Sequence, residues 1–443
     1  MEAEWEAVRS MVLEQLDGTY DLDDAQLRGQ IAEQASIYGA AHLLSLRGRG
    51  EMERQVYNSL RRYDVIQDLL DDPEITEIMI NGCRKIFYEK EGSIRVWDRT
   101  FSSEERLESV IQQIAAYANK TVNEAEPIVD TRLADGSRVN IVIPPASPDG
   151  PCITIRKFAA QPVTLQRLQD LDSISGEIHA FLNLLVRAGC NLFVSGGTGS
   201  GKTTLLNALS QAIPGDERII TIEDSAELHL LGIDNLVRME ARQANANGAC
   251  EITIRDLIRT SLRMRPDRII VGEVRGAEAL ELLQANNTGH DGGMSTGHAN
   301  SCRDMLSRLE TMVLMGMDLP LSAVRGQIAS GIDVMIHLGR MRDKTRKVLQ
   351  ICEMDGVRDG EIILHPLYEF CETGNDLKRV IGEWKRVGML RHTGKLKAQG
   401  MEDELAEVYK TGEQIRELPA AGGGSSVCGR DRASRGDDRM AVL

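Results

Sequence analysis

Residues 191–206 read Asn-Leu-Phe-Val-Ser-Gly-Gly-Thr-Gly-Ser-Gly-Lys-Thr-Thr-Leu-Leu. An apolar run typical of a buried strand, 192–194, leads into a glycine-rich loop, and a second apolar run, 205–209, is typical of a helix. Glycines allow successive backbone N–H groups to converge on an anion at a helix N-terminus, where unpaired amides and the helix dipole favour negative charge. The pattern GxxxxGK[ST] therefore predicts a P-loop that binds a nucleoside triphosphate.

Each part of this loop has an expected task. Lys202 is expected to reach the β- and γ-phosphates and to act in catalysis, and Thr203 to place its hydroxyl on Mg2+, a cation that prefers hard oxygen ligands. The predicted cofactors are ATP and Mg2+. The residues predicted to contact the nucleotide here are Gly196, Gly197, Thr198, Gly199, Ser200, Gly201, Lys202, Thr203 and Thr204.

Two further strand-like runs end in acidic residues. Residues 219–222 lead to Glu223 and Asp224, and residues 269–272 lead to Glu273. Carboxylates at strand ends can hold the water shell of Mg2+ or orient and deprotonate the attacking water. We predict that Glu273 orients this water and that Glu223 is also catalytic; the alternative is that both simply cap helices or form turns.

Two histidines lie in the glycine-rich stretch 288–300. A zinc site is disfavoured because no third or fourth Cys or His ligand stands at a usable spacing. A histidine beside a triphosphate can instead donate a hydrogen bond to the γ-phosphate, and His298 is the stronger candidate of the pair. The alternative for both His290 and His298 is a histidine of the core or of a turn.

Three arginines stand out upstream of the P-loop. Arg132 and Arg138 flank an Asp-Gly hairpin signal, and Arg156 ends the following strand-like run. A hinge between domains could bring these cations against the γ-phosphate. The alternative is that they are ordinary surface arginines.

Composition limits the class of protein. The chain has 443 residues and a net charge of -15, which disfavours a general nucleic-acid binder. Its 8 cysteines are scattered without metal-ligand spacing, as expected for reduced thiols in the cytoplasm. No apolar run approaches the ~18 residues that span a bilayer, so we expect a cytoplasmic protein that is peripheral at the inner membrane through a partner.

Changes in the residue pattern along the chain predict its domain organisation. Residues 1–62 are helix-prone, with Ile31, Ala35, Tyr38, His42 and Leu43 at helical spacing. We predict an α+β domain at 63–160, a linker at 161–170, an α/β ATPase domain at 171–370, a C-terminal extension at 371–418 and a disordered tail at 419–443.

Local patterns predict several elements within these domains. A helix at 103–119, capped by Ser102 with Glu105, buries the stripe Leu107, Val110, Ile111, Ile114 and Ala115. Alternating helices and apolar strands after residue 170 predict a mostly parallel sheet covered on both faces. Runs at 333–338, 345–353 and 361–364 predict antiparallel strands at the edge of this sheet.

Four motifs in order carry a family resemblance. They are the P-loop at 196–204, Ile-Glu-Asp-Ser-Ala-Glu-Leu at 222–228, Arg-Pro-Asp-Arg-Ile-Ile-Val-Gly-Glu-Val-Arg-Gly at 265–276, and Gly-His-x-Gly-x(4)-Gly-His-Ala-Asn-Ser at 289–301. This set resembles the secretion ATPases of the type II/type IV superfamily over about residues 69–364. The segments 71–82 and 128–140 resemble most closely the tight-adherence (Flp) pilus assembly branch.

The resemblance implies a RecA-like motor domain preceded by a PAS-like domain, assembled as a homo-hexamer with ATP between the two domains. It implies that Glu223 lies in an aspartate box, that Glu273 is the Walker B glutamate, and that His298 belongs to a histidine box. It also implies that Arg132, Arg138 and Arg156 sense nucleotide. Gly293 and Gly297 replace larger residues of the family, so we expect looser packing around the histidine box.

These observations predict a hexameric motor ATPase for pilus assembly or protein secretion across the inner membrane. Its expected partners are a polytopic inner-membrane platform protein and the pilin export machinery, with no nucleic acid. The alternatives are a nucleotide-gated scaffold with negligible hydrolysis, and a DNA-transfer or retraction motor of the same superfamily.

Overall fold

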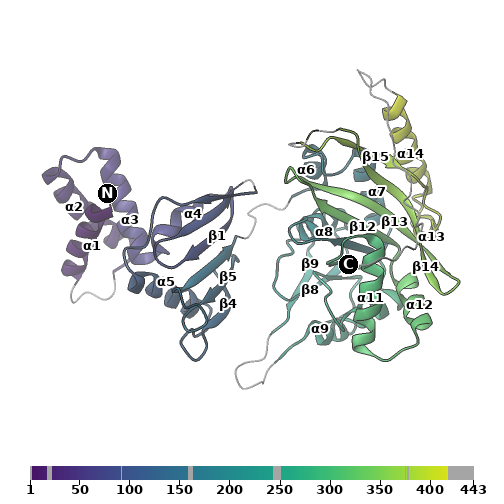
Figure 1. The fold of residues 1–443 in the computed structure, drawn as a ribbon, viewed down its shortest axis with the longest axis horizontal. Helices are drawn as coiled ribbons and strands as arrows, with labels where there is room; N and C mark the ends of the chain where they lie inside the picture. Colours follow the sequence, from purple (N-terminus) through teal and green to yellow (C-terminus); the bar gives the residue numbers. More distant parts are fainter. Residues whose placement is uncertain are drawn as a thin grey trace, which may run out of the picture. The chain divides into compact units, whose positions relative to one another are not determined.

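The computed structural model describes residues 2–16, 22–90, 92–157, 163–242, 251–374, 376 and 379–417. The chain divides into two compact units, Met1–Gln161 and Pro162–Leu443, and Figure 1 follows it from one end to the other. The predicted fold class is confirmed: a helical segment, a small α+β domain and a P-loop α/β domain follow one another. The predicted tail, 419–443, lies outside the described residues.

The described part of the helical segment holds three helices with a core of their own. Their bounds are α1 (Glu2–Leu16), α2 (Asp24–Ala41) and α3 (Leu46–Arg61). Asp23 caps α2 and Ser45 caps α3, each through its side chain. The buried cluster comprises Trp5, Val8, Val12, Leu27, Ile31, Ala35, Met52, Val56 and Tyr57. The predicted apolar stripe is too long, because α2 ends at Ala41 and Leu43 is 93% exposed.

An antiparallel sheet, here the N-terminal sheet, forms the rest of the first unit. Its strand order is β3-β2-β1-β6-β5-β4. The elements are η1 (Asp64–Ile66), α4 (Gln67–Asp71), β1 (Ile75–Asn81), β2 (Ile86–Lys90), β3 (Ser93–Val96), α5 (Glu104–Tyr117), β4 (Ile128–Arg132), β5 (Arg138–Val142) and β6 (Cys152–Arg156). Helix α5 buries the whole predicted stripe against the sheet. Its N-cap is Ser103 rather than the predicted Ser102, because the Ser103 hydroxyl accepts the N–H of Arg106.

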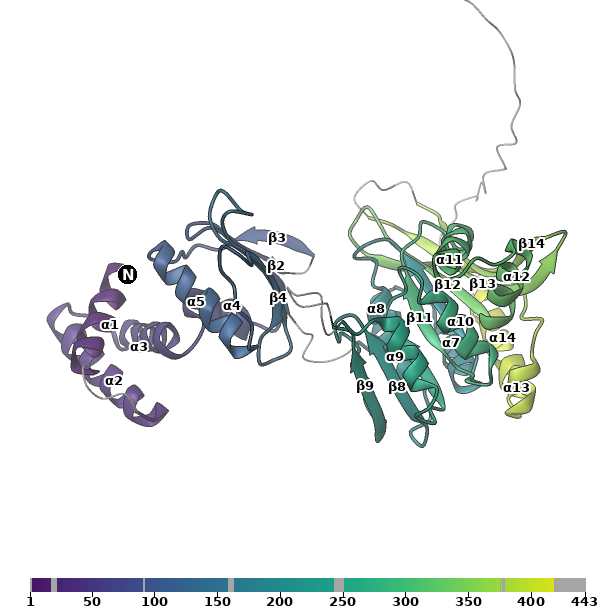
Figure 2. The ribbon, with the colours of Figure 1, turned by 90° about the horizontal axis from the view of Figure 1, so that it is seen from below.

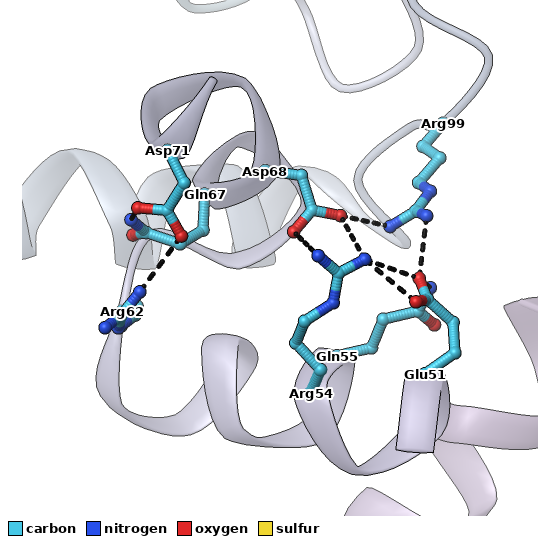
Figure 3. Close-up of polar contacts among 8 residues, drawn as sticks. All are labelled: Glu51, Arg54, Gln55, Arg62, Gln67, Asp68, Asp71 and Arg99. Carbon is cyan, nitrogen blue, oxygen red and sulfur yellow. Dashed lines mark hydrogen bonds and ion pairs between the residues drawn. The ribbon is translucent and has the colours of Figure 1, made fainter. Parts of the chain in front are cut away.

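A network of ion pairs ties the helical segment to the sheet domain (Figure 3). Arg54 on α3 contacts Glu51 at 2.8 Å and Asp68 on α4 at 3.1 Å. Arg99, which follows β3, closes the network at 2.9 Å from Glu51 and 2.8 Å from Asp68. We call these four residues the N-terminal network. Each of the four charges contacts two of opposite sign.

The second unit contains a mixed sheet, here the central sheet. Its strand order is β15-β14-β13-β12-β7-β11-β10-β8-β9, and Figure 2 shows β8 and β9 at one end and β14 toward the other. The strands are β7 (Leu192–Gly196), β8 (Arg218–Glu223), β9 (Asn235–Glu240), β10 (Arg268–Val271), β11 (Met294–Gly297), β12 (Val334–Arg340), β13 (Arg346–Arg358), β14 (Glu361–Glu372) and β15 (Gly382–Arg386).

Helices cover both faces of the central sheet. They are α6 (Leu165–Asp170), α7 (Gly176–Arg187), α8 (Lys202–Ser210), α9 (Ile254–Ser261), α10 (Ala279–Asn287), α11 (Cys302–Gly316), α12 (Leu321–Gly331), α13 (Gly394–Ala398) and α14 (Glu402–Glu417). Val194 packs with residues of α7 and α8, whereas its neighbour Phe193 packs with residues of α10 and α11. Alternate residues of one strand thus face opposite layers, as predicted.

One strand direction differs from the prediction. β12 pairs in parallel with β7 and antiparallel with β13. The predicted antiparallel edge therefore begins only at β13. The physical reason is that α12 leads into β12 and supplies the long crossover that a parallel connection requires.

The two ends of the second unit both pack on its core. Leu165 and Leu168 of α6, within the segment predicted as a linker, are buried there. In the C-terminal extension, Leu396, Leu405 and Tyr409 join the same cluster. In the part of the chain that the structure describes, no helix is both long and apolar enough to cross a bilayer.

Candidate nucleotide-binding site

Neighbouring parallel strands bring the predicted site residues of the second unit to one edge. β7, β11, β10 and β8 lie side by side in the central sheet. The P-loop follows β7, His298 follows β11, Glu273 follows β10, and Glu223 ends β8. Since the carboxyl ends of parallel strands meet at the same edge, we call this set the nucleotide edge.

The conformation of the P-loop requires its glycines. Gly199 and Gly201 have φ values of 69° and 96°, in the left-handed region. A Cβ on Gly196 would lie 2.5 Å from Ser200 Oγ and 2.6 Å from the carbonyl oxygen of Leu338. Among the described atoms, the buried hydroxyl of Ser200 has no hydrogen-bond partner. A close-packed loop at the N-terminus of α8 with a spare buried hydroxyl fits a phosphate chain.

Lys202 links the P-loop to the histidine that follows β11. Its Nζ donates to the carbonyl oxygen of Gly197 at 3.1 Å and lies 3.3 Å from Nδ1 of His298. Only 7% of Lys202 is exposed. A cation is therefore held at the mouth of the loop, where phosphates would bind.

Glu273 continues the same series of contacts. Its Oε1 lies 3.0 Å from Nε2 of His298, and its Oε2 accepts a hydrogen bond of 2.8 Å from Arg275. Burial opposes ionisation of Glu273, but the hydrogen bond and charge of Arg275 outweigh it and hold the pKa of this carboxyl below its usual value. The carboxylate is thus ionised at neutral pH, the state required of a residue that orients water.

His298 lies between Lys202 and Glu273, and its ionisation follows from this position. Burial lowers the pKa of His298 and outweighs the opposing effect of Glu273. The ring is therefore neutral at neutral pH and keeps one N–H for donation.

Glu223 makes different contacts from those of Glu273. Its Oε1 accepts the backbone N–H groups of Glu227 at 2.8 Å and Leu228 at 3.0 Å. Burial raises the pKa of Glu223 to about 7, although both hydrogen bonds favour the ionised form. These contacts fix the turn after β8. The catalytic role of Glu223 stays a prediction.

The glycines of the histidine box lie in tight packing. A Cβ on Gly297 would meet Met305 at 2.9 Å and Phe193 at 3.0 Å, and one on Gly293 would clash with Oδ1 of Asn286. The expectation of looser packing is therefore wrong, because neighbouring side chains occupy the space. His290 lies apart from the P-loop contacts, with Nδ1 3.5 Å from Thr288 Oγ1.

The three candidate arginines lie in the first unit, in one row across the N-terminal sheet. Arg132 pairs in register with Arg138, and Arg138 with Arg156. Directly paired residues project from the same face, so three cations stand side by side on β4, β5 and β6. We call them the arginine row. Their role toward a nucleotide stays a prediction.

The sequence reasoning missed residues that the turn between β12 and β13 brings to the P-loop. Arg346 donates from Nε to the carbonyl oxygen of Gly199 at 3.3 Å, and Arg340 Nη1 lies 3.7 Å from the Cβ position of that glycine. His337 on β12 lies 2.9 Å from the hydroxyl of Ser195. The apolar run at 333–338 could have indicated these residues. It was predicted to be an antiparallel strand at the edge of the sheet, which would place it away from the P-loop.

An apolar parallel strand, a glycine cradle, a lysine inside it and an ionised glutamate at a nearby strand end define a P-loop nucleoside triphosphatase. The chain belongs to the type II/IV secretion system protein family, whose model matches residues 60–417. It is accordingly an ATPase, and the family resemblance is confirmed. The tight-adherence branch stays a prediction.

Several relatives are similar to this chain. A candidate conjugal transfer protein of Mycobacterium tuberculosis is 34% identical over 67% of this chain and 86% of its own length. The type IV secretion system protein PtlH of Bordetella pertussis is 35% identical over 65% of this chain and 93% of its own. A crystal structure of the VirB11 ATPase from the Brucella suis type IV secretion system, in complex with sulphate, is 30% identical, with coverages of 65% and 95% and a TM-score of 0.37.

Proposed function

We propose that the chain is the motor of a pilus assembly machine of the tight-adherence type. In this proposal it forms a homo-hexamer, hydrolyses ATP with Mg2+, and drives a polytopic inner-membrane platform protein and the pilin export machinery from the cytoplasmic face. The observation that carries the hydrolytic part of the proposal is the series of contacts Lys202–His298–Glu273–Arg275 at the nucleotide edge. It joins a phosphate-binding cation to an ionised carboxylate.

The P-loop, Thr203 and Glu273 each have a task in hydrolysis. The P-loop amides and Lys202 hold the phosphates of ATP. Thr203, half-buried at the start of α8, would hold Mg2+, which when bound neutralises phosphate charge. Glu273 orients a water and accepts its proton as the oxygen bonds to the γ-phosphorus and the bond to the β–γ bridging oxygen breaks.

His298 and the arginine row supply the response to nucleotide. His298 touches both Lys202 and Glu273, so a γ-phosphate that pulls on Lys202 also changes the surroundings of Glu273. The arginine row supplies cations that approach the γ-phosphate when the two units close around ATP. This closing motion is the mechanical step passed on to the platform protein.

Two alternative functions remain, a nucleotide-gated scaffold and a DNA-transfer motor, and different observations bear on each. A scaffold with negligible hydrolysis would be favoured by a loosely packed histidine box, but the packing around Gly293 and Gly297 is tight. A DNA-transfer motor is favoured by the name of the mycobacterial relative. The net charge of -15 favours protein cargo instead.

The proposal is tested by steady-state phosphate release from the purified, assembled protein, with and without vesicles of inner-membrane lipid. We expect turnover by the natural sequence and a loss of at least about 100-fold in Lys202→Ala, which removes the phosphate-binding cation. Circular dichroism should show that the variant keeps its fold. Equal turnover in both proteins contradicts the site assignment, and ATP binding without turnover favours the scaffold. Recovery of a polytopic membrane protein with the motor tests the pilus role.

A further inference from the structure

The hairpin of β12 and β13 continues beyond the strand that carries the P-loop. β12 pairs in parallel with β7 as far as Leu338, which lies in register with Gly196, the last residue of β7. Past this point β12 and β13 remain paired with each other, as far as Arg340 opposite Arg346. The end of the hairpin therefore lies next to the place where the P-loop begins.

Arg346, the first residue of β13, contacts the backbone of the P-loop. Its Nε donates a hydrogen bond of 3.3 Å to the carbonyl oxygen of Gly199. Its Cγ lies 3.8 Å from the position that a Cβ on Gly201 would occupy. The side chain therefore lies along the loop, with its polar end at Gly199 and its apolar stem at Gly201.

The two glycines that Arg346 contacts are the P-loop residues in the left-handed backbone region, with φ values of 69° for Gly199 and 96° for Gly201. Glycine populates many backbone conformations, so a loop with 4 glycines between residues 196 and 201 loses much entropy when it adopts a single one. Its N–H groups converge on a phosphate only in that conformation. A contact that holds both left-handed glycines therefore favours the conformation that binds phosphate.

The turn that presents Arg346 is itself held in place. The backbone N–H of Met341 donates to the carbonyl oxygen of Thr345 at 2.8 Å, and that of Lys344 donates to the carbonyl oxygen of Met341 at 3.0 Å. The carboxylate of Asp343 accepts the N–H of Thr345 at 3.1 Å and its hydroxyl at 2.6 Å. It also accepts the N–H of Val380, just before β15, at 2.8 Å. Arg346 thus approaches the loop from a fixed point.

We propose that Arg346 is a positioning residue for nucleotide binding, which holds the P-loop in the conformation that receives the phosphates. The inference rests on the proposed function and deepens it, because it assigns the support of the ATP site to the β12–β13 hairpin. Arg346 acts on a carbonyl of the loop, whereas phosphates bind to the N–H groups. A loop already held in its binding conformation loses less entropy when the ligand arrives. The same loop receives ATP and ADP, so Arg346 supports the binding of both.

Two substitutions and a matched control test this role. Arg346→Met keeps an apolar stem beside Gly201 and removes the hydrogen bond to Gly199. Arg346→Lys keeps a cation that can donate to the same carbonyl oxygen. The control is Arg358→Met at the other end of β13, where the guanidinium pairs with Asp355 at 3.1 Å.

The measurements are made on the full chain. Deuterium exchange without nucleotide follows residues 198–206, which include the amides of Ser200 and Leu205 that hydrogen-bond within the loop and the first turn of α8. The Kd values of fluorescent ATP and ADP analogues, kcat at saturating ATP and the melting temperature are also measured.

We expect the amides of the loop to exchange about 5- to 20-fold faster in Arg346→Met, and the Kd values of both analogues to rise about 5- to 20-fold. The kcat at saturating ATP should stay within about threefold, because the catalytic groups are unchanged. Arg346→Lys should lie between Arg346→Met and the natural sequence, and the control should match the natural sequence.

If Arg346→Met does not fold, the intermediate values expected for Arg346→Lys decide the question. Unchanged exchange of the loop overturns the inference, and weaker nucleotide binding in that case would mean that the guanidinium contacts phosphate directly. Unchanged Kd values in the folded variants also overturn it and leave the proposed function standing. Absence of turnover by the natural sequence overturns the proposed function, while the exchange and the Kd values still decide the role of Arg346.

Discussion

The nucleotide edge of the central sheet and the arginine row of the N-terminal sheet use charge in opposite ways. At the nucleotide edge, the cation Lys202, the neutral ring of His298, the carboxylate Glu273 and the cation Arg275 contact one another in turn. In the arginine row, three cations stand next to one another on adjacent strands, and Glu77 on β1 is the next residue in register, beside Arg156. Like charges directly opposite in a sheet are destabilising.

The difference shows what each region is built for. Polar and oppositely charged groups in contact hold one another in fixed geometry, which suits groups that must be aligned with a reacting atom. Arginine side chains bind phosphate through paired, charge-assisted hydrogen bonds, which suits the proposed role of the row as a sensor of phosphate. The N-terminal network is a third arrangement, in which alternating charges serve attachment alone.

The largest effect that tests this contrast is expected at the nucleotide edge. Glu273→Gln keeps the shape of the side chain and removes its charge, so water is no longer deprotonated. We expect ATP to stay bound while phosphate release falls about 100- to 1,000-fold. Single-turnover assays and nucleotide retention on a desalting column measure the two properties. Glu361→Gln, an exposed carboxylate on β14, is the control. Normal turnover by Glu273→Gln would show that another residue orients the water.

A smaller loss is expected in the arginine row. Arg138→Ala removes the central cation of the proposed sensor, and we expect kcat to fall about 10- to 100-fold because less of the developing charge on the γ-phosphate is neutralised. The matched control is Arg95→Ala on β3, at the other edge of the same sheet. Equal kcat for the two variants would contradict the proposed role of the arginine row as a phosphate sensor.

The ionisation of Glu223 makes the free energy of unfolding depend on pH. Its folded pKa of about 7 lies above the ordinary 4.5, so the folded state binds this proton more tightly than the unfolded state. The stabilisation is complete below pH 4.5 and is lost as the pH rises through 7. Between pH 5 and 8 we therefore expect the natural sequence to lose about 1 to 3 kcal/mol more stability than Glu223→Gln. Urea titrations at both pH values measure this difference, and parallel pH curves would contradict it.

The smallest effect is expected in the N-terminal network. Arg99→Ala leaves Arg54 in contact with both Glu51 and Asp68, and the side chains are partly exposed. We expect a loss below about 1 kcal/mol that shrinks further at high salt. Thermal melts in low and high salt measure it. A loss several times larger, independent of salt, would mean that the network does more than attach the helices.

Much of the fold and of the site follows from local sequence. The strand, glycine loop and helix at 191–209 are specified by residues that touch one another along the chain, and so are the buried stripe of α5 and the Asp135-Gly136 hairpin. Glu223 and Glu273 were also predictable from local sequence, because each directly follows an apolar strand-like run. Apolar strands with polar last residues mark the edge where ligands bind.

Other features depend on strand order and register, which no local pattern encodes. Because β12 lies parallel to β7, His337 and Arg346 reach the P-loop, although about 140 residues separate them from it in sequence. Register alone aligns Arg132, Arg138 and Arg156 into a row. The packing of Met305 and Phe193 around Gly297 likewise required the assembled core.

The sequence by itself therefore determined the chemistry of this protein: a phosphate cradle, its lysine and a carboxylate at a strand end, all set by short-range backbone and side-chain preferences. The tertiary structure alone decided which side chains hold that chemistry in place. Those contacts join distant segments, and their geometry exists only once the sheet has formed and fixed its order and register.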